Sequence, residues 1–173
     1  TINKIRFDPT NPCEDDIDIR DIAHALSMMT RANGHFTEFY SVARHSVNCA
    51  LEATARGYSK RVALFCLLHD SAESYIGDMT RPLKMHFPLF SEYEKKLQKV
   101  IFSKYATLDI AEDEKEKVKS VDDSLLYHEF LCYHGDKLFD FTPEIHIDVK
   151  DNSKNISETE KEFLCMYEAL KIK

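Results

Sequence analysis

The segment Val62-Ala63-Leu64-Phe65-Cys66-Leu67-Leu68 is strongly apolar and leads directly into the pair His69-Asp70. Ser59 is a suitable N-cap, so the pattern predicts a buried helix that begins there and includes the pair. Glu73 then lies on the same side of that helix as the pair. A histidine and an aspartate in apolar surroundings are costly unless a partner satisfies them, and a divalent metal ion does so. A surface or capping role is the ordinary alternative for one such pair.

Two other segments offer further metal-binding side chains. Val42–Ser46 opens a second helical stretch and carries His45, and Val118–Asp122 places a carboxylate among apolar neighbours on a third. Neutral imidazole nitrogens and carboxylate oxygens together form a donor set that suits several divalent ions. The sequence therefore predicts one metal site built from three separate helices.

In the order His45, then His69-Asp70, then Asp122, the chain resembles the HD domain family of metal-dependent phosphohydrolases. The segment Leu67–Lys84 is similar to the core of the bacterial 5′-deoxynucleotidases, and also to the related viral dATP triphosphohydrolases. The likeness covers about residues 20–135. It implies one divalent ion (Zn, Mn, Co, Fe, Ni or Mg) bound by His45, His69, Asp70 and Asp122.

The resemblance also implies roles for side chains around the metal. Those enzymes carry an acid three residues after the pair, then Gly-Asp and a Pro-x-Lys ending, which correspond here to Glu73, Asp78 and Lys84. Glu73 and Asp78 are thereby expected to act in catalysis. The residues expected to hold the substrate are Arg31, Asp78, Met79, Thr80, Arg81 and Lys84.

One departure from the deoxynucleotidase pattern concerns the residue after the arginine. The deoxynucleotidases have Arg-Trp ahead of the first histidine, whereas this chain has Arg31-Ala32 and contains no tryptophan. Arg31 matches the arginine of those enzymes, but Ala32 does not match their tryptophan. The selectivity of the site for base and sugar therefore stays open.

Composition favours one all-α domain. The chain has 173 residues, of which 43% are hydrophobic and 31% are charged, with only 4 glycines and 5 prolines. We expect a single HD-type domain over 1–173, with a core at about 20–135, built as a bundle of six or seven helices. Apolar periodicity and capping signals place the helices at about 16–30, 42–56, from 59 through the pair, 89–105, 112–134 and 157–172, the last one capped by Ser157 and Glu160.

Charge and cysteine usage exclude other classes. A formal net charge of −7 argues against binding to a nucleic acid polymer, which needs a basic surface. No apolar run reaches the roughly 18 residues of a membrane span, and we see no signal peptide. The odd count of 5 cysteines without Cys-x-x-Cys favours reduced thiols over disulfides or a thiolate metal site. These features predict a cytoplasmic protein, either monomeric or a homo-oligomer.

The function expected from the resemblance is metal-dependent release of phosphate from a small nucleotide. The substrate favoured by the resemblance is a 5′-deoxynucleotide. A dATP-type triphosphohydrolase uses the same ligands and is the first alternative. A non-catalytic, nucleotide-binding regulatory HD domain is the second alternative, and the complete ligand set with Glu73 and Asp78 argues against it. A helical interaction module is a third, which the buried charged groups disfavour.

Overall fold

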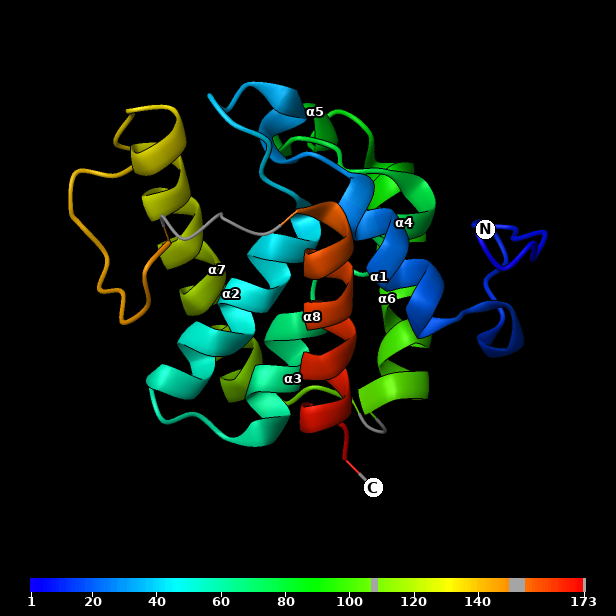
Figure 1. Ribbon diagram of the computed structural model, residues 1–173. Helices are drawn as coiled ribbons and strands as arrows, with labels where there is room; N and C mark the ends of the chain where they lie inside the picture. The colour runs from blue at the N-terminus through cyan, green and yellow to red at the C-terminus, as the bar shows by residue number, and fades with distance from the viewer. Residues whose placement is uncertain (107–108, 150–154, 173) are drawn as a thin grey trace.

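The computed structural model describes residues 1–106, 109–149 and 155–172 and is an all-helical bundle over these residues, as predicted (Figure 1). Among these residues, six α-helices are longer than one turn and two are single turns. The elements are η1 (Glu14–Asp16), α1 (Ile19–Met28), η2 (Arg31–Gly34), α2 (Val42–Ala55), α3 (Lys60–Leu68), α4 (Glu73–Ile76), α5 (Arg81–Lys84), α6 (Pro88–Ala106), α7 (Glu112–Tyr133) and α8 (Ile156–Leu170).

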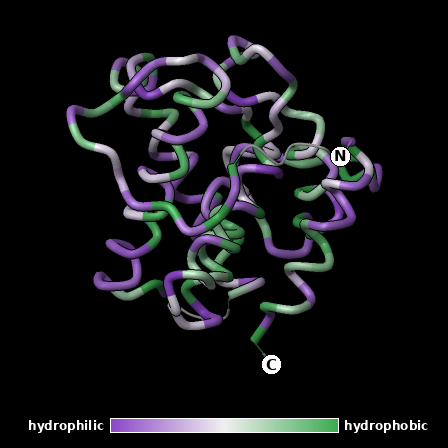
Figure 2. The backbone as a smooth tube through the Cα atoms, turned by 60° about the vertical axis from the view of Figure 1, so that its left-hand side comes forward, coloured by the Kyte–Doolittle hydropathy of each residue, from purple (hydrophilic) through white to green (hydrophobic). Residues whose placement is uncertain are grey.

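Helix α3 lies at the centre of the bundle, where it packs against α2, α6, α7 and α8 (Figure 1). The predicted cap is confirmed, because the Ser59 hydroxyl accepts a hydrogen bond from the backbone N–H of Val62. Every residue from Val62 to Leu68 is buried. Burial of each large apolar side chain stabilises the fold by about 1.5–3 kcal/mol. In Figure 2 the surrounding helices alternate between hydrophilic and hydrophobic along the chain, which is typical of helices with one buried face.

The prediction that α3 includes the His-Asp pair is wrong. The helix ends at Leu68, His69 is its C-cap, and Asp70 lies in the following turn. The side chain of Gln98 from α6 ends the helix here. Its Nε2 donates to the Leu68 carbonyl at 2.7 Å, and its Oε1 accepts from the Ala72 N–H at 3.0 Å. Because Gln98 satisfies backbone groups that a helix end leaves unpaired, the chain can turn and begin α4 at Glu73.

Helix α8 has a capping box of the predicted kind, but two residues earlier than predicted. The side chain of Asn155 accepts from the Glu158 N–H at 3.0 Å, and the Glu158 carboxylate accepts from the Asn155 N–H at 2.9 Å. Ser157 and Glu160 have the same spacing, but Glu160 is used elsewhere, in an ion pair with His24 of α1 at 3.0 Å.

Hydropathy along the helices bears on the membrane prediction. Over the part of the chain that the structure describes, no helix is both long and apolar enough to cross a bilayer.

Candidate functional site

The four predicted ligand residues come together at one point. His45 Nε2 lies 3.3 Å from His69 Nε2, 3.2 Å from Asp122 Oδ1 and 3.8 Å from Asp70 Oδ2. His69 Nε2 lies 3.2 Å from Asp70 Oδ2 and 3.8 Å from Asp122 Oδ1. Two atoms bound to one ion at about 2.0–2.2 Å are about 2.8–3.8 Å apart for angles of roughly 90–120°. These five distances therefore fit a single ion bound by the four side chains, here called the four-donor cluster.

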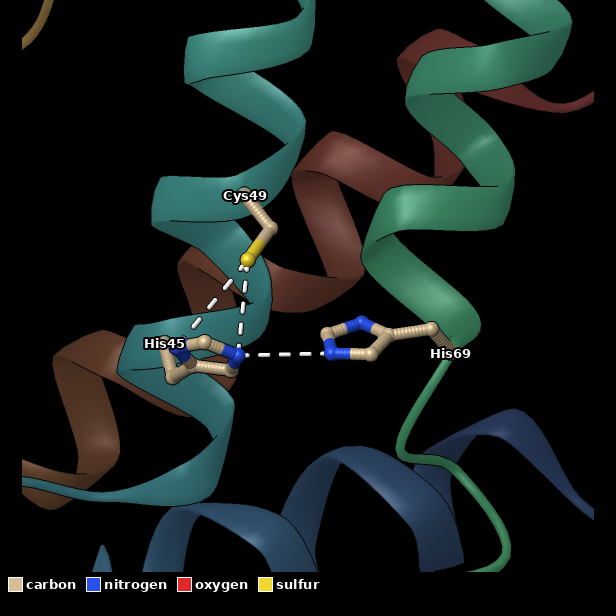
Figure 3. A group of neighbouring side chains, drawn as sticks. All are labelled: His45, Cys49 and His69. Carbon is tan, nitrogen blue, oxygen red and sulfur yellow. Dashed lines mark hydrogen bonds between the residues drawn. The ribbon is translucent and has the colours of Figure 1, made fainter. Parts of the chain in front are cut away.

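The hydrogen bonds of the two imidazoles fix which nitrogen faces inward. His45 Nδ1 lies 2.7 Å from Glu129 Oε1, and His69 Nδ1 lies 2.7 Å from the Cys66 carbonyl. Because both partners are acceptors, each Nδ1 donates, so in the neutral form of each ring the lone pair lies on Nε2. The two Nε2 atoms point toward one another (Figure 3), and in neutral rings neither can donate to the other. A cation between them resolves this conflict, so the residues present fit a metal ion.

The electrostatics of the cluster also favour a positive charge at its centre. Burial alone would lower the pKa of His69, but the carboxylates of Asp70 and Asp122 outweigh burial and hold that pKa well above its usual range. Burial alone would raise the pKa of Asp122, but hydrogen bonds with His45 and His69 hold it well below. The cluster thus stabilises added positive charge, whether protons or a divalent ion.

Glu129 is a site residue that the sequence reasoning missed. It is fully buried on α7, and its Oε1 accepts from Tyr40 Oη at 3.0 Å as well as from His45 Nδ1. Its Oε2 forms an ion pair with Arg31 Nε at 3.1 Å. Burial alone would raise the pKa of Glu129, but His45 and Arg31 outweigh it and lower that pKa. The sequence feature that could have identified Glu129 is its position seven residues after Asp122, on the same face of a helix.

Replacement of Glu129 by glutamine is expected to weaken metal binding about 10–100-fold, because a neutral amide oxygen is a weaker acceptor for the His45 Nδ1 proton than the carboxylate that orients the ring. Loss of the buried charge is also expected to destabilise the fold by about 3–5 kcal/mol. Glu52→Gln is a matched control, since Glu52 is equally buried but bonds Arg56 and His146 away from the cluster. Metal titration and denaturant unfolding of both variants check this. Equal metal affinity in the two variants would refute a role for Glu129.

Cys49 lies one helical turn after His45 and beside its ring (Figure 3). Its Sγ is 3.4 Å from Nε2 and 3.9 Å from Nδ1 of that ring. The ligand atoms of His45, Cys49 and His69 all lie within 4.8 Å of one another, so this group could hold a metal ion. The sequence predicted a buried reduced thiol here and gave no sign of its nearness to the histidines. Burial raises the pKa of Cys49, which disfavours the thiolate that a metal would need.

A cavity of about 440 Å³, here called the Asp78 cavity, opens beside the cluster. That volume is in the usual range for sites that bind small molecules. It brings together every residue predicted to hold substrate, with both predicted catalytic acids. Its lining is Arg31, Ala32, Asp70, Glu73, Asp78, Met79, Thr80, Arg81, Pro82, Lys84, Asp122, Leu126, Phe130 and Leu138. The sequence did not single out the apolar members Leu126, Phe130 and Leu138.

The two predicted catalytic acids of this cavity, Glu73 and Asp78, lie near other carboxylates. Glu73 is 7% exposed, and its Oε2 has no hydrogen-bond partner among the described residues. Burial, together with Asp70 and Asp78, raises the pKa of Glu73 to about 10. Burial also raises the pKa of Asp78. Glu73 can therefore hold a proton near neutral pH at the edge of the cluster.

The cations of the cavity are tied to carboxylates. Arg31 Nη1 lies 3.4 Å from Asp70 Oδ2, so this guanidinium bridges Asp70 and Glu129. Arg81 lies 3.5 Å from Asp122, and Lys84 is paired with Glu94 at 2.6 Å.

Ala32, directly after Arg31, has a left-handed backbone with φ of 50°. Such a conformation costs an alanine about 1–2 kcal/mol.

Arg31→Ala is expected to lower kcat/KM for a phosphate substrate tenfold or more, and Arg31→Lys is expected to restore it poorly. A guanidinium can bind carboxylate oxygens on two sides and still present N–H groups to the cavity, whereas an ammonium cannot reproduce that fork. Steady-state kinetics of both variants checks this, with Arg20→Lys as the control, since Arg20 is an exposed arginine that pairs with Asp18. Near wild-type kcat/KM for Arg31→Lys would remove Arg31 from substrate binding.

A larger cavity, of about 860 Å³, lies elsewhere, and its lining contains none of the four donors. The arginine in its lining, Arg56, already donates hydrogen bonds to Glu52, Ser120, Ser124 and the Glu144 carbonyl. With its arginine committed in this way, this cavity is a weaker candidate for a reactive site than the Asp78 cavity.

Comparison with known proteins found no matching family model. The chain is 40% identical over 92 residues to the uncharacterized protein YfdR of Escherichia coli K12, and 44% identical over 84 residues to an uncharacterized protein of Rhodobacter capsulatus. It is 30% identical over 95 residues to the 5′-deoxynucleotidase yfbR of Photorhabdus temperata. These matches cover 53%, 46% and 49% of this chain. The chain spans about half the length of these curated relatives, at 49%, 42% and 48%. The similarity to a deoxynucleotidase is thus distant and partial.

Proposed function

We propose that this protein is an HD-type, metal-dependent phosphohydrolase that releases phosphate from a small deoxynucleotide, as a 5′-deoxynucleotidase does. The observation that carries the proposal is the four-donor cluster of His45, His69, Asp70 and Asp122, which adjoins a cavity lined by both acids and cations. The partial similarity to a 5′-deoxynucleotidase supports the same reaction class.

A divalent ion at the cluster would supply Lewis acidity, which polarises a phosphoryl oxygen and lowers the pKa of a water molecule. The chain's own groups would do the rest. Arg31 and Lys84 would bind phosphate oxygens whose charge changes in the transition state. Glu73, deeply buried beside Asp70, would move a proton to or from the reacting oxygens, while Asp78 would orient the substrate.

The shape of the cavity supports a nucleoside as the group that carries the phosphate. Asp122, Leu126 and Phe130 are four residues apart on α7, so they form one stripe along the cavity wall. Eight residues of helix rise about 12 Å. A phosphate beside Asp122 would thus place a sugar and base along Leu126 and Phe130, with Leu138 closing the far end.

A phosphate-release screen tests the proposal. Mono-, di- and triphosphates of deoxy- and ribonucleosides are incubated with the protein and each of several divalent metals. Metal-dependent release of inorganic phosphate from deoxynucleoside monophosphates is expected. Release of tripolyphosphate from triphosphates would favour the triphosphohydrolase alternative. Nucleotide binding without hydrolysis by metal-loaded protein would favour a regulatory domain and overturn the proposal.

A further inference from the structure

The four-donor cluster is also reached by a second cavity. This cavity of about 300 Å³, here called the Val118 cavity, lies between α6 and α7 and is lined by His69 and Asp122 together with Phe102, Val118, Lys115 and Lys119. Among the residues that the structure describes, Asp122 alone lines both this cavity and the Asp78 cavity. Each cavity therefore reaches the cluster at Asp122 and at one further donor, which is Asp70 in the Asp78 cavity and His69 in the Val118 cavity.

We propose that inorganic phosphate leaves the cluster through the Val118 cavity, while the nucleoside occupies and leaves through the Asp78 cavity. This inference rests on the proposed function. The two donors that line the Val118 cavity, His69 and Asp122, are partly exposed, with side chains 12% and 22% exposed. A phosphate formed at the cluster would therefore have a way out that does not wait for the nucleoside.

Charge separates the two openings. Within the Asp78 cavity an outgoing phosphate dianion would be retained by the cations that held the substrate, Arg31, Arg81 and Lys84. The Val118 cavity has Lys115 and Lys119 at its rim, with side chains 54% and 67% exposed. Both pair with acids of their own helix, but exposed pairs of this kind are weak and leave the ammonium groups able to attract an anion.

The walls of the Val118 cavity suit passage rather than retention. Phe102 and Val118 offer no hydrogen bonds, and Gln98 has both ends of its amide committed to the backbone at Leu68 and Ala72. A phosphate would therefore find attractive charge at the mouth and no tight binding site on the way.

The test uses two substitutions on α7 that each fill one cavity, Val118→Trp and Leu126→Trp. The protein is loaded with Co²⁺, whose visible absorption changes when phosphate enters its coordination sphere, and phosphate binding is followed by stopped flow. Phosphate must enter and leave by the same route, so the binding rate reports on that route. Leu126→Trp is expected to abolish binding of deoxyadenosine monophosphate and to leave the phosphate binding rate within about threefold of wild type.

The double variant, Leu126→Trp with Val118→Trp, is expected to slow phosphate binding tenfold or more. Should the double variant fail to fold, Lys115→Glu and Lys119→Glu replace Val118→Trp in the Leu126→Trp protein. These exposed changes are expected to slow phosphate binding and remove its dependence on salt.

Slow phosphate binding in Leu126→Trp alone, or a double variant as fast as that single one, would overturn the second route. The proposed function would survive either result. If phosphate leaves the absorption of Co²⁺-loaded wild-type protein unchanged, both the proposed function and this inference are wrong.

Discussion

His69→Ala and Asp70→Ala are each expected to purify with almost no bound divalent ion, whereas the wild-type protein is expected to hold about one per chain. Each change removes one donor from the cluster and leaves the rest mismatched, because the lone pair of His45 Nε2 and the carboxylate of Asp122 then face each other without their shared cation. Phosphate release is expected to fall to the uncatalysed background. Metal analysis by mass spectrometry and an assay with added metal measure both effects.

The control for the metal prediction is His24→Ala. His24 is also a partly buried histidine in an ion pair with an acid, Glu160, but it lies between α1 and α8, away from the cluster. This variant is expected to retain its metal and its activity. Full metal occupancy in both His69→Ala and Asp70→Ala would show that the four-donor cluster does not bind the ion.

Glu73→Ala is expected to keep its metal and fold while kcat falls by roughly 10²–10⁴, the usual effect of losing general acid–base assistance. Glu73 begins α4 and lies outside the four-donor cluster, so its loss leaves every donor in place. Asp78→Asn serves as the comparison, because Asp78 is assigned to hold the substrate and its loss should raise KM more than it lowers kcat. Wild-type turnover in Glu73→Ala would make Glu73 structural and Asp78 the better candidate for the catalytic acid.

The elements that the sequence predicted well are those set by local interactions. The Ser59 cap depends on a hydrogen bond to a residue three positions away. The end of α3 was misplaced because Gln98, thirty residues later in the chain, satisfies the Leu68 carbonyl. Local pattern alone would continue that helix through the pair.

The same distinction explains which site residues were found. The donors His45, His69, Asp70 and Asp122 followed a known order along the chain, and the structure brings them together. Glu129 was missed because a glutamate within a charged helix is usually exposed. Its burial depends on Tyr40 and Arg31, which come from a distant loop.

The position of Glu129 between His45 and Arg31 has a consequence for how ligands would bind. The Glu129 carboxylate contacts His45, a proposed metal ligand, through one oxygen and Arg31, a proposed substrate-binding residue, through the other. A phosphate that attracts Arg31 would change the electrostatic interaction of Arg31 with that carboxylate. The affinity of His45 for its ion would change as a result. The two binding equilibria would then be thermodynamically linked. If the bound ion changes the affinity for phosphate by some factor, bound phosphate changes the affinity for the ion by the same factor. An affinity for either ligand would have meaning only at a stated concentration of the other.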